Sequence, residues 1–261
     1  MKSTAVRIFL LCLPLYFTAC SEDGDFNVFS TQQDLELGQQ TDQQIRSEPQ
    51  EFPILDPQDY PQAYAYLQGM VDEIVSQGNV PYADLFPYEV AIINKDVENA
   101  FATPGGFLYV YTGLVQRLET GDQLAGVMAH EIAHSAERHS TDQLTKQYGI
   151  STLLSLISGG DPGLLSQIAS GLLTLQFSRS DESEADDRSV DYLCETDYAA
   201  NGAAGFFEMI QDSINPPAFL STHPNPDDRV QEINQRAIDK NCDTNTAELA
   251  PFQQFQRNLP K

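Results

Sequence analysis

The sequence predicts an α+β fold that is mostly helical and has a small antiparallel or mixed sheet. Apolar residues recur at three- and four-residue intervals along most of the chain, which is typical of amphipathic helices. Runs rich in aromatic and β-branched residues lie at 88–112, where Pro104-Gly105-Gly106 interrupts them. With 261 residues, of which 41% are hydrophobic, the chain is long enough to build one core.

Residues 1–19 are predicted to be a signal peptide. Two basic residues precede an apolar run that is too short to span a bilayer core of about 30 Å. The end of this run resembles a bacterial lipoprotein signal, which implies that Cys20 is the first mature residue and carries the lipid. The alternative is an ordinary secretory signal whose removal takes Cys20 with it. Ser21 after the cysteine resembles the pattern of lipoproteins sent to the outer membrane, so we expect its periplasmic face.

The polar stretch 20–33 is predicted to be a tether. The elements expected after it are a weak helix at 33–47, a proline-containing connector at 48–61, a helix at 60–77, a strand at 88–93, a strand at 107–112 that follows the Pro-Gly-Gly turn, and a short helix at 113–120. Asp122 is the expected N-cap of the helix that comes next.

Two apolar helices are expected at 149–158 and 164–177, split by the glycines of 159–163. Core packing is the favoured interpretation of this pair, and a mobile lid hinged on the glycines is the alternative. Further helices are expected at 181–196, 198–214 and 224–240. The folded domain is therefore predicted to span 34–245, with 246–261 as a C-terminal tail.

The charge balance restricts the partners. The chain carries 14 Lys and Arg against 38 Asp and Glu, a formal net charge of −24. Such a surface repels the phosphates of nucleic acid and of anionic lipid, so we expect no nucleic-acid partner. Contact with a membrane is expected through the N-terminal lipid only, because no second apolar run reaches eighteen residues.

The cysteines agree with export from the cytoplasm. After removal of the signal and lipidation of Cys20, only Cys194 and Cys242 remain. In an oxidising compartment such a pair is expected to form a disulfide. A loop of this size would contribute about 4 kcal/mol in the chain-entropy model. The alternative is two free buried thiols.

The motif that carries chemistry is His130-Glu131-x-x-His134. On a helix the two histidines share one face and can direct a nitrogen each at the same point. Glu131 lies about 100° further round the helix, where it reaches a metal-bound water without binding the metal. This arrangement supplies two zinc ligands and a general base. The apolar neighbours indicate a buried helix, which disfavours two incidental surface histidines.

A catalytic zinc needs a third protein ligand. His139 would lie about 140° away from His134 on a continuing helix, so it is excluded. The remaining candidates are in the acidic run 181–187. Glu182 is the predicted ligand, and Glu184 is the alternative. Asp186 shares a face with Glu182 and is predicted to orient a ligand histidine.

These motifs together are similar to those of metallopeptidase family M48, which includes HtpX, the CAAX prenyl endopeptidase and Oma-like zinc proteases. The similarity rests on the HExxH run with His139, the Ser178–Asp186 run, the Asn99–Gly106 segment, and Thr222-His223-Pro224 with Arg229. It implies a zincin-like (minigluzincin) fold, one Zn²⁺ per chain, and a compact lipoprotein type. It independently supports Glu182 as a ligand.

The expected chemistry is peptide-bond hydrolysis. Zinc lowers the pKa of a bound water to about 7, and Glu131 would take the proton and pass it to the leaving amine. His223 is the candidate donor to the oxyanion; the family resemblance alternatively makes it a fourth zinc ligand in a latent enzyme, and a third reading is a helix cap. Asn99, Gly105 and Gly106 are predicted to contact substrate.

The predicted function is therefore that of a zinc endopeptidase of the bacterial envelope that cleaves misfolded or misassembled proteins. An exposed strand at 107–112 or 99–103 would bind an extended chain through its backbone, which suits unfolded substrates. The alternative is a zinc-stabilised chaperone-like or binding lipoprotein with little proteolysis.

Overall fold

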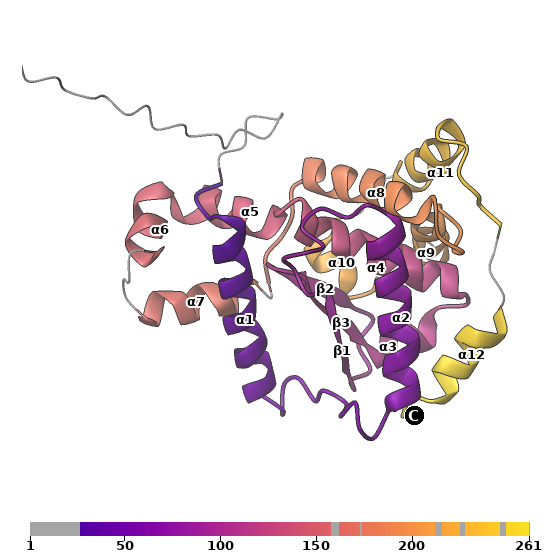
Figure 1. The fold of residues 1–261 in the computed structure, drawn as a ribbon, viewed down its shortest axis with the longest axis horizontal. Coiled ribbons are helices and arrows are strands. Elements are labelled where there is room, and N and C mark those ends of the chain that lie inside the picture. Colours follow the sequence, from indigo (N-terminus) through magenta and orange to yellow (C-terminus); the bar gives the residue numbers. More distant parts are fainter. Residues whose placement is uncertain are drawn as a thin grey trace, which may run out of the picture.

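The computed structural model describes residues 27–157, 162–172, 174–211, 216–224, 228–245 and 249–260. Its helices and strands follow one another in an α+β arrangement, as predicted (Figure 1). In chain order they are α1 Thr31–Ser47, α2 Pro61–Gln77, β1 Glu89–Ile93, β2 Ala100–Thr103, β3 Phe107–Tyr111, α3 Thr112–Arg117, α4 Gly121–Ala136, α5 His139–Tyr148, α6 Ile150–Ile157, α7 Pro162–Leu172, α8 Arg179–Leu193, α9 Gly202–Gln211, α10 Phe219–Thr222, α11 Arg229–Asp239 and α12 Leu249–Arg257.

The sheet is mixed and has the order β1-β3-β2. The strands expected at 88–93 and 107–112 are present as β1 and β3, but they run parallel to each other. The hairpin around the Pro-Gly-Gly turn is formed by β3 with β2, a strand that was not among the expected elements, and it places Ala100 opposite Val110. Gly105 and Gly106 have φ angles of 75° and 85°, which side chains with a Cβ adopt only at a cost. The turn therefore depends on its glycines.

The two edges of this sheet differ. On the outer side of β1, the side chain of Gln68 accepts a hydrogen bond from the N–H of Val90, and the hydroxyl of Tyr64 accepts one from the N–H of Ile92. Residues 53–55 cover the remaining end of this strand through bonds such as Leu55 N–H to the Ile92 carbonyl. Among the described residues, no strand pairs with the outer side of β2. β2 is thus the open edge.

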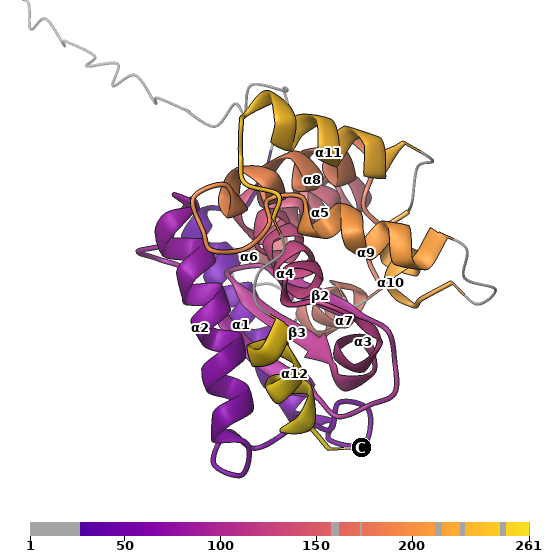
Figure 2. The same ribbon diagram turned by 90° about the vertical axis from the view of Figure 1, so that its right-hand side faces the viewer.

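Helix α4 lies between the sheet and a layer formed by α8, α9 and α11 (Figure 2). All of its residues are buried. The helix begins two residues earlier than the sequence suggested: Thr120 is the N-cap, and it exchanges hydrogen bonds with Gln123 in a capping box. The predicted cap, Asp122, instead accepts a hydrogen bond from the N–H of Ala199.

The N-terminal part of the described chain is more ordered than a tether. Ser30 caps α1, so the helix starts inside the stretch 20–33 that was predicted to be flexible. Phe29 is buried, and Asn27 donates a hydrogen bond to Thr141 of α5. The predicted signal peptide and Cys20 lie outside the described residues.

Helices α6 and α7 stand beside α1, to the left of the main body in Figure 1. Leu153 and Ile168 pack with Phe29, Leu37 and Leu144 in a cluster of their own. This supports the packing interpretation, although the cluster is separate from the main core. α7 ends at Leu172, five residues before its predicted end. Gly159 and Gly160, the hinge of the lid alternative, lie outside the described residues.

The predicted C-terminal tail contains a helix. Phe252 and Phe255 of α12 are buried in the main core, and Phe255 stacks on Tyr66 with ring centroids 4.7 Å apart. The prediction of a tail at 246–261 is therefore wrong for this segment. Leu249, Phe252 and Phe255 recur every three residues, a helical spacing that the sequence analysis overlooked.

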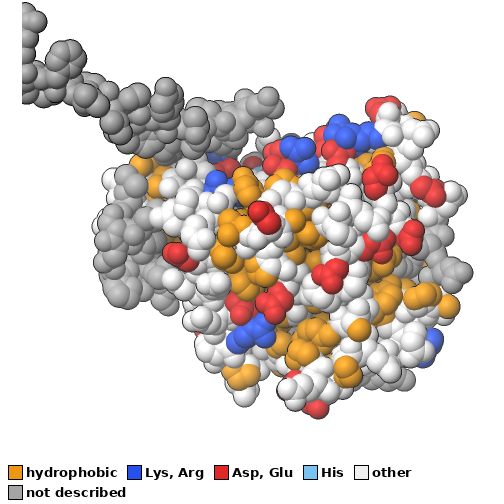
Figure 3. Space-filling model, in the orientation of Figure 1, with side chains coloured by type: hydrophobic (Ala, Val, Ile, Leu, Met, Phe, Trp, Pro, Cys, Tyr) orange, Lys and Arg blue, Asp and Glu red, His pale blue; other side chains and the backbone are white. Residues whose placement is uncertain are grey.

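Acidic side chains are scattered over the face shown in Figure 3, and Lys and Arg are fewer there. This agrees with the net charge of −24. Within the described part of the chain, no helix combines the length and apolar character needed to cross a membrane.

The predicted disulfide is present. Cys194, the C-cap of α8, is bonded to Cys242, which follows α11. The bond closes a loop with a sequence separation of 48 residues. It ties together the ends of two helices that both contribute to the site described below.

Replacing both cysteines with serine should lower the free energy of unfolding by about 4 kcal/mol, because the unfolded chain regains the entropy of an open loop of this length. Urea denaturation of the wild type and the double variant measures the difference. The wild type treated with a reductant is the control and should show the same loss. A loss below about 1 kcal/mol in both samples would contradict the expectation.

Candidate metal centre

Helix α4 places two imidazoles on one face, as the i, i+4 spacing predicts. The Nε2 atoms of His130 and His134 lie 3.0 Å apart. Both side chains are buried, with 1% of their surface exposed. The possibility of two incidental surface histidines is thereby excluded.

Two more side chains reach the same point. Glu182 comes from the first turn of α8, and His223 is the C-cap of α10. Glu182 Oε1 lies 3.3 Å from His134 Nε2 and 3.0 Å from His223 Nδ1. His223 Nδ1 lies 3.3 Å from His130 Nε2. One nitrogen or oxygen from each of the four residues thus lies within 4.8 Å of the others.

The spacing of these atoms fits a zinc ion. Ligand atoms about 2.0–2.1 Å from a tetrahedral zinc lie about 3.3 Å from one another. Four of the pairs formed by the three histidine nitrogens and Glu182 Oε1 are 3.0 to 3.3 Å apart, close to the separation that such an ion requires. Imidazole and carboxylate are ligands that zinc accepts. A cation bound here would also lie between the Nε2 atoms of His130 and His134, which otherwise face each other at 3.0 Å.

A buried arginine stabilises the carboxylates around the cluster. Asp186 Oδ1 lies 2.9 Å from Nδ1 of His130, the position predicted for an orienting partner. Arg229 donates to both oxygens of Asp186 at 2.6 Å, and its Nη1 lies 3.0 Å from Glu182 Oε2. The guanidinium carbon also lies 3.9 Å from the centre of the Phe207 ring. Arg229 therefore fixes a ligand and the partner of a ligand at once.

The two glutamates of the site differ in electrostatics. Burial raises the pKa of Glu182, but His223 and hydrogen bonds from His130 and His134 outweigh it and hold this pKa far below its usual value. For Glu131, burial prevails over His223 and His130 and raises the pKa of the carboxyl. Glu182 is thus an anion suited to a cation, whereas Glu131 has the greater proton affinity that a base needs.

His139 is close to the cluster for a reason that the sequence did not reveal. α4 ends at Ala136, and Arg138 adopts a left-handed conformation with φ of 64°. This break turns the chain back, so that His139 Nδ1 lies 2.9 Å from Nδ1 of His134. The argument from a continuing helix was therefore wrong. His139 is nevertheless not a member of the cluster, because it faces Nδ1 of His134, the nitrogen that points away from the other three side chains.

His223 is not a helix cap for α11, which starts six residues later at Arg229. Its Nδ1 belongs to the four-atom cluster, and its Nε2 lies 3.4 Å from Glu131 Oε1. The position matches a fourth ligand more closely than the donor to an oxyanion that was first predicted. Two aromatic rings that the sequence did not indicate enclose the site: Phe177 stacks on His134 with centroids 3.9 Å apart, and Phe219 stacks on His223 at 4.2 Å.

The family follows from a comparison with known proteins. A family model described as Peptidase family M48 matches residues 61–237, which include every side chain of the cluster. The chain belongs to peptidase family M48. The resemblance drawn from the motifs is thereby confirmed.

Several named proteases are similar in sequence to this M48 chain. A putative beta-barrel assembly-enhancing protease of Vibrio cholerae is 32% identical over 58% of this chain and 35% of its own length. The mitochondrial metalloendopeptidase OMA1 of Schizosaccharomyces pombe is 30% identical over 57% of this chain and 46% of its own length. The metalloprotease YcaL of Escherichia coli is 32% identical over 53% of this chain and 58% of its own length. The matches thus cover between a third and three fifths of the relatives.

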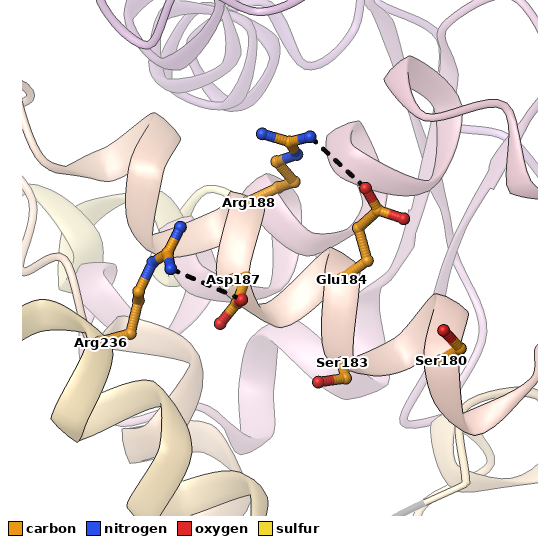
Figure 4. A pocket seen from close by; sticks show the side chains of 6 residues that line it. All are labelled: Ser180, Ser183, Glu184, Asp187, Arg188 and Arg236. Atoms are coloured by element: carbon orange, nitrogen blue, oxygen red, sulfur yellow. Dashed lines mark hydrogen bonds and ion pairs between the residues drawn. The ribbon is translucent and has the colours of Figure 1, made fainter. Parts of the chain in front are cut away.

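In this M48 chain, Glu184 points away from the cluster. It lines a surface hollow of about 380 Å³ along α8, where Figure 4 shows it paired with Arg188 and Asp187 paired with Arg236. Its other neighbour is His139, with 3.5 Å between Oε2 and Nε2. The alternative in which Glu184 rather than Glu182 joins the two histidines has no support in this geometry.

The residues predicted to contact substrate separate into two groups. Gly105 and Gly106 are buried: a Cβ on Gly105 would meet Leu35 at 2.6 Å, and one on Gly106 would meet Tyr88 at 3.1 Å. They shape the turn, so the structure does not support substrate contact for them. Asn99 precedes β2, and its buried Oδ1 has no hydrogen-bond partner among the described residues. It remains a candidate.

Proposed function

We propose that this M48 chain is a zinc-dependent endopeptidase that cleaves misfolded or misassembled proteins in the bacterial envelope. The observation that carries the proposal is the cluster of three histidine nitrogens and one glutamate oxygen with Glu131 beside it. The family and the metallopeptidase relatives support the same activity.

His130, His134 and Glu182 would hold the zinc ion. When bound, zinc polarises the scissile carbonyl and makes water a stronger acid. Glu131 takes the proton from the attacking water and delivers it to the leaving amine, a role that its raised pKa supports. Asp186 keeps the ring of His130 in place, and Arg229 pairs with both Asp186 and Glu182 in a buried site.

The substrate would bind as an additional strand on β2. This edge is open. Its position next to the site follows from a hydrogen bond: the N–H of Ala102 in β2 donates to Glu131, which lowers the pKa of that carboxyl. Pairing with an edge uses the backbone of the substrate and hence selects for extended chains rather than for a particular sequence. Asn99 lies just before this edge, and its buried Oδ1, which has no partner among the described residues, would accept a backbone N–H of the substrate once the site opens.

His223 would bind zinc as the fourth ligand in the conformation described here. All four ligand side chains are almost fully buried, with 0–1% of their surface exposed. A site closed in this way is latent, and His223 must leave before a peptide carbonyl can enter. Once displaced, it would be free to donate to the oxyanion as first expected.

The location follows from the predicted lipoprotein signal. We propose attachment through a lipid on Cys20 to the periplasmic face of the outer membrane, with no other membrane contact. The relatives named as beta-barrel assembly-enhancing proteases suggest misassembled outer-membrane proteins as substrates.

Removal of zinc tests the proposal. After treatment with a chelator, cleavage of casein should fall by roughly 100-fold or more, since a metal contributes several kcal/mol to charge stabilisation. One equivalent of Zn²⁺ per chain should restore it, and elemental analysis of the untreated protein should find the same stoichiometry. Mg²⁺ in place of Zn²⁺ is the control and should not restore cleavage. Full activity in the metal-free protein would refute the proposal.

A further inference from the structure

The turn that carries His223 is held on two sides. We call residues 219–223, which comprise α10 and its C-cap, the His223 turn. On one side the N–H of Phe219 donates to the carbonyl of Glu98, next to β2. On the other side the side-chain amide of Gln176 donates to the carbonyl of Ser221 at 3.1 Å. The N–H of Phe177 donates to the carbonyl of Thr222 at 3.2 Å.

Phe177 also contacts the rings of the cluster. Its ring lies nearly parallel to that of His134, with an interplanar angle of 23° and 3.9 Å between centroids. The centroid of the His223 ring is 5.3 Å away. The same short segment therefore touches one proposed zinc ligand directly and holds the backbone beside another.

Gln176 and Phe177 belong to the segment that connects α7 to the helix of Glu182, α8. Gln176 and Phe177 lie between Leu172, the last residue of α7, and Ser178, the N-cap of the helix that carries Glu182. α7 belongs to the separate cluster with Phe29. Residues 176 and 177 are therefore one link between that cluster and the ligand helix, beside the hydrogen bond that Gln143 of α5 donates to Asp181 of α8.

We propose that Gln176 and Phe177 form a clasp that keeps the His223 turn in the metal cluster, so that substrate enters only when the clasp releases the turn. The proposal rests on the proposed function, in which His223 is a zinc ligand. Both are positioning residues, since neither is placed to touch the substrate. The activity of the resting protein is then scaled by the small fraction of molecules whose clasp is open.

Gln176 is the better residue to change. It is exposed, and its contact with the turn is one neutral hydrogen bond, whereas Phe177 also supports His134. Gln176→Ala should raise the open fraction roughly five-fold, the factor that corresponds to the loss of one such bond. Thr174→Ala is the matched control, because Thr174 is exposed in the same segment and bonds only locally, to the carbonyl of Gly171.

Hydrogen exchange provides a readout that does not depend on activity. Amides in a peptide that covers 216–224 should exchange roughly five-fold faster in zinc-loaded Gln176→Ala than in the wild type or in Thr174→Ala. Casein cleavage should rise by a similar factor. Phe177→Leu should also speed exchange, and it should weaken zinc binding roughly ten-fold because His134 loses its stacked neighbour.

Unchanged exchange in both Gln176→Ala and Phe177→Leu would overturn the proposal. Faster exchange without faster cleavage in Gln176→Ala, in a preparation whose wild type is active, would overturn the gating role of the clasp. If neither the wild type nor Gln176→Ala cleaves casein, the proposed function fails. The exchange measurement then still decides whether residues 176 and 177 hold the His223 turn.

Discussion

Glu131→Gln should reduce the cleavage of casein by about 10²–10⁴-fold while the protein keeps its fold and one zinc per chain. Glutamine preserves the shape of the side chain but cannot take a proton from water. Glu131 is outside the four-residue cluster, so its replacement leaves the proposed ligands in place. Initial rates of cleavage, zinc content and circular dichroism measure the three parts of the expectation.

Glu184→Gln is the matched control for this prediction. It makes the same chemical change on the surface hollow of α8, and its cleavage rate should stay within a few-fold of the wild type. Cleavage that persists in Glu131→Gln would exclude Glu131 as the base. If the variant loses cleavage but retains the cellular role of the protein, the chaperone-like alternative would be favoured over proteolytic quality control.

Arg229→Met should destabilise the protein by about 3–5 kcal/mol, which is the typical effect of leaving buried charges without their partner. The guanidinium is 1% exposed and neutralises both Asp186 and Glu182. Methionine restores much of the volume but none of the charge. Urea denaturation of the zinc-free protein measures the loss, and titration with Zn²⁺ should show weaker binding, because Asp186 no longer holds His130 in place.

Arg236→Met separates this effect from a general sensitivity of α11. Arg236 lies two turns further along the same helix and pairs with Asp187 and Asp191 at the surface. Partly exposed pairs of this kind contribute about 0–1 kcal/mol, so this variant should remain close to the wild type in stability. Equal losses in the two variants would show that the buried pairing of Arg229 has no special role.

The centre of the site could be predicted from local spacing. Two histidines four residues apart on an apolar helix define a shared face, and helical geometry separates Glu182 from Glu184 within the acidic run. The turn at Pro104-Gly105-Gly106 and the strand after it were equally accessible, but the strand that completes the hairpin, β2, was not predicted. These features depend only on residues that are near one another in the sequence.

The missed features depend on contacts between distant residues or on unusual backbone angles. Nothing in the sequence shows that Arg138 adopts a positive φ angle, and this angle is what brings His139 back to His134. Phe177 was assigned to the end of a helix, but the helix stops earlier and frees its ring to reach the cluster. The N-cap was misplaced because Thr120 and Asp122 are both good caps, and Gln123 favours the first.

The unequal edges of the sheet have a consequence for self-association. A molecule with two free strand borders can stack on copies of itself and grow into a fibre. Here Gln68 and Tyr64 occupy one border, so two copies could pair only through β2, and that contact uses both open edges and closes as a dimer. The edge proposed to bind substrate can therefore stay exposed without the protein growing into a fibre through that same surface.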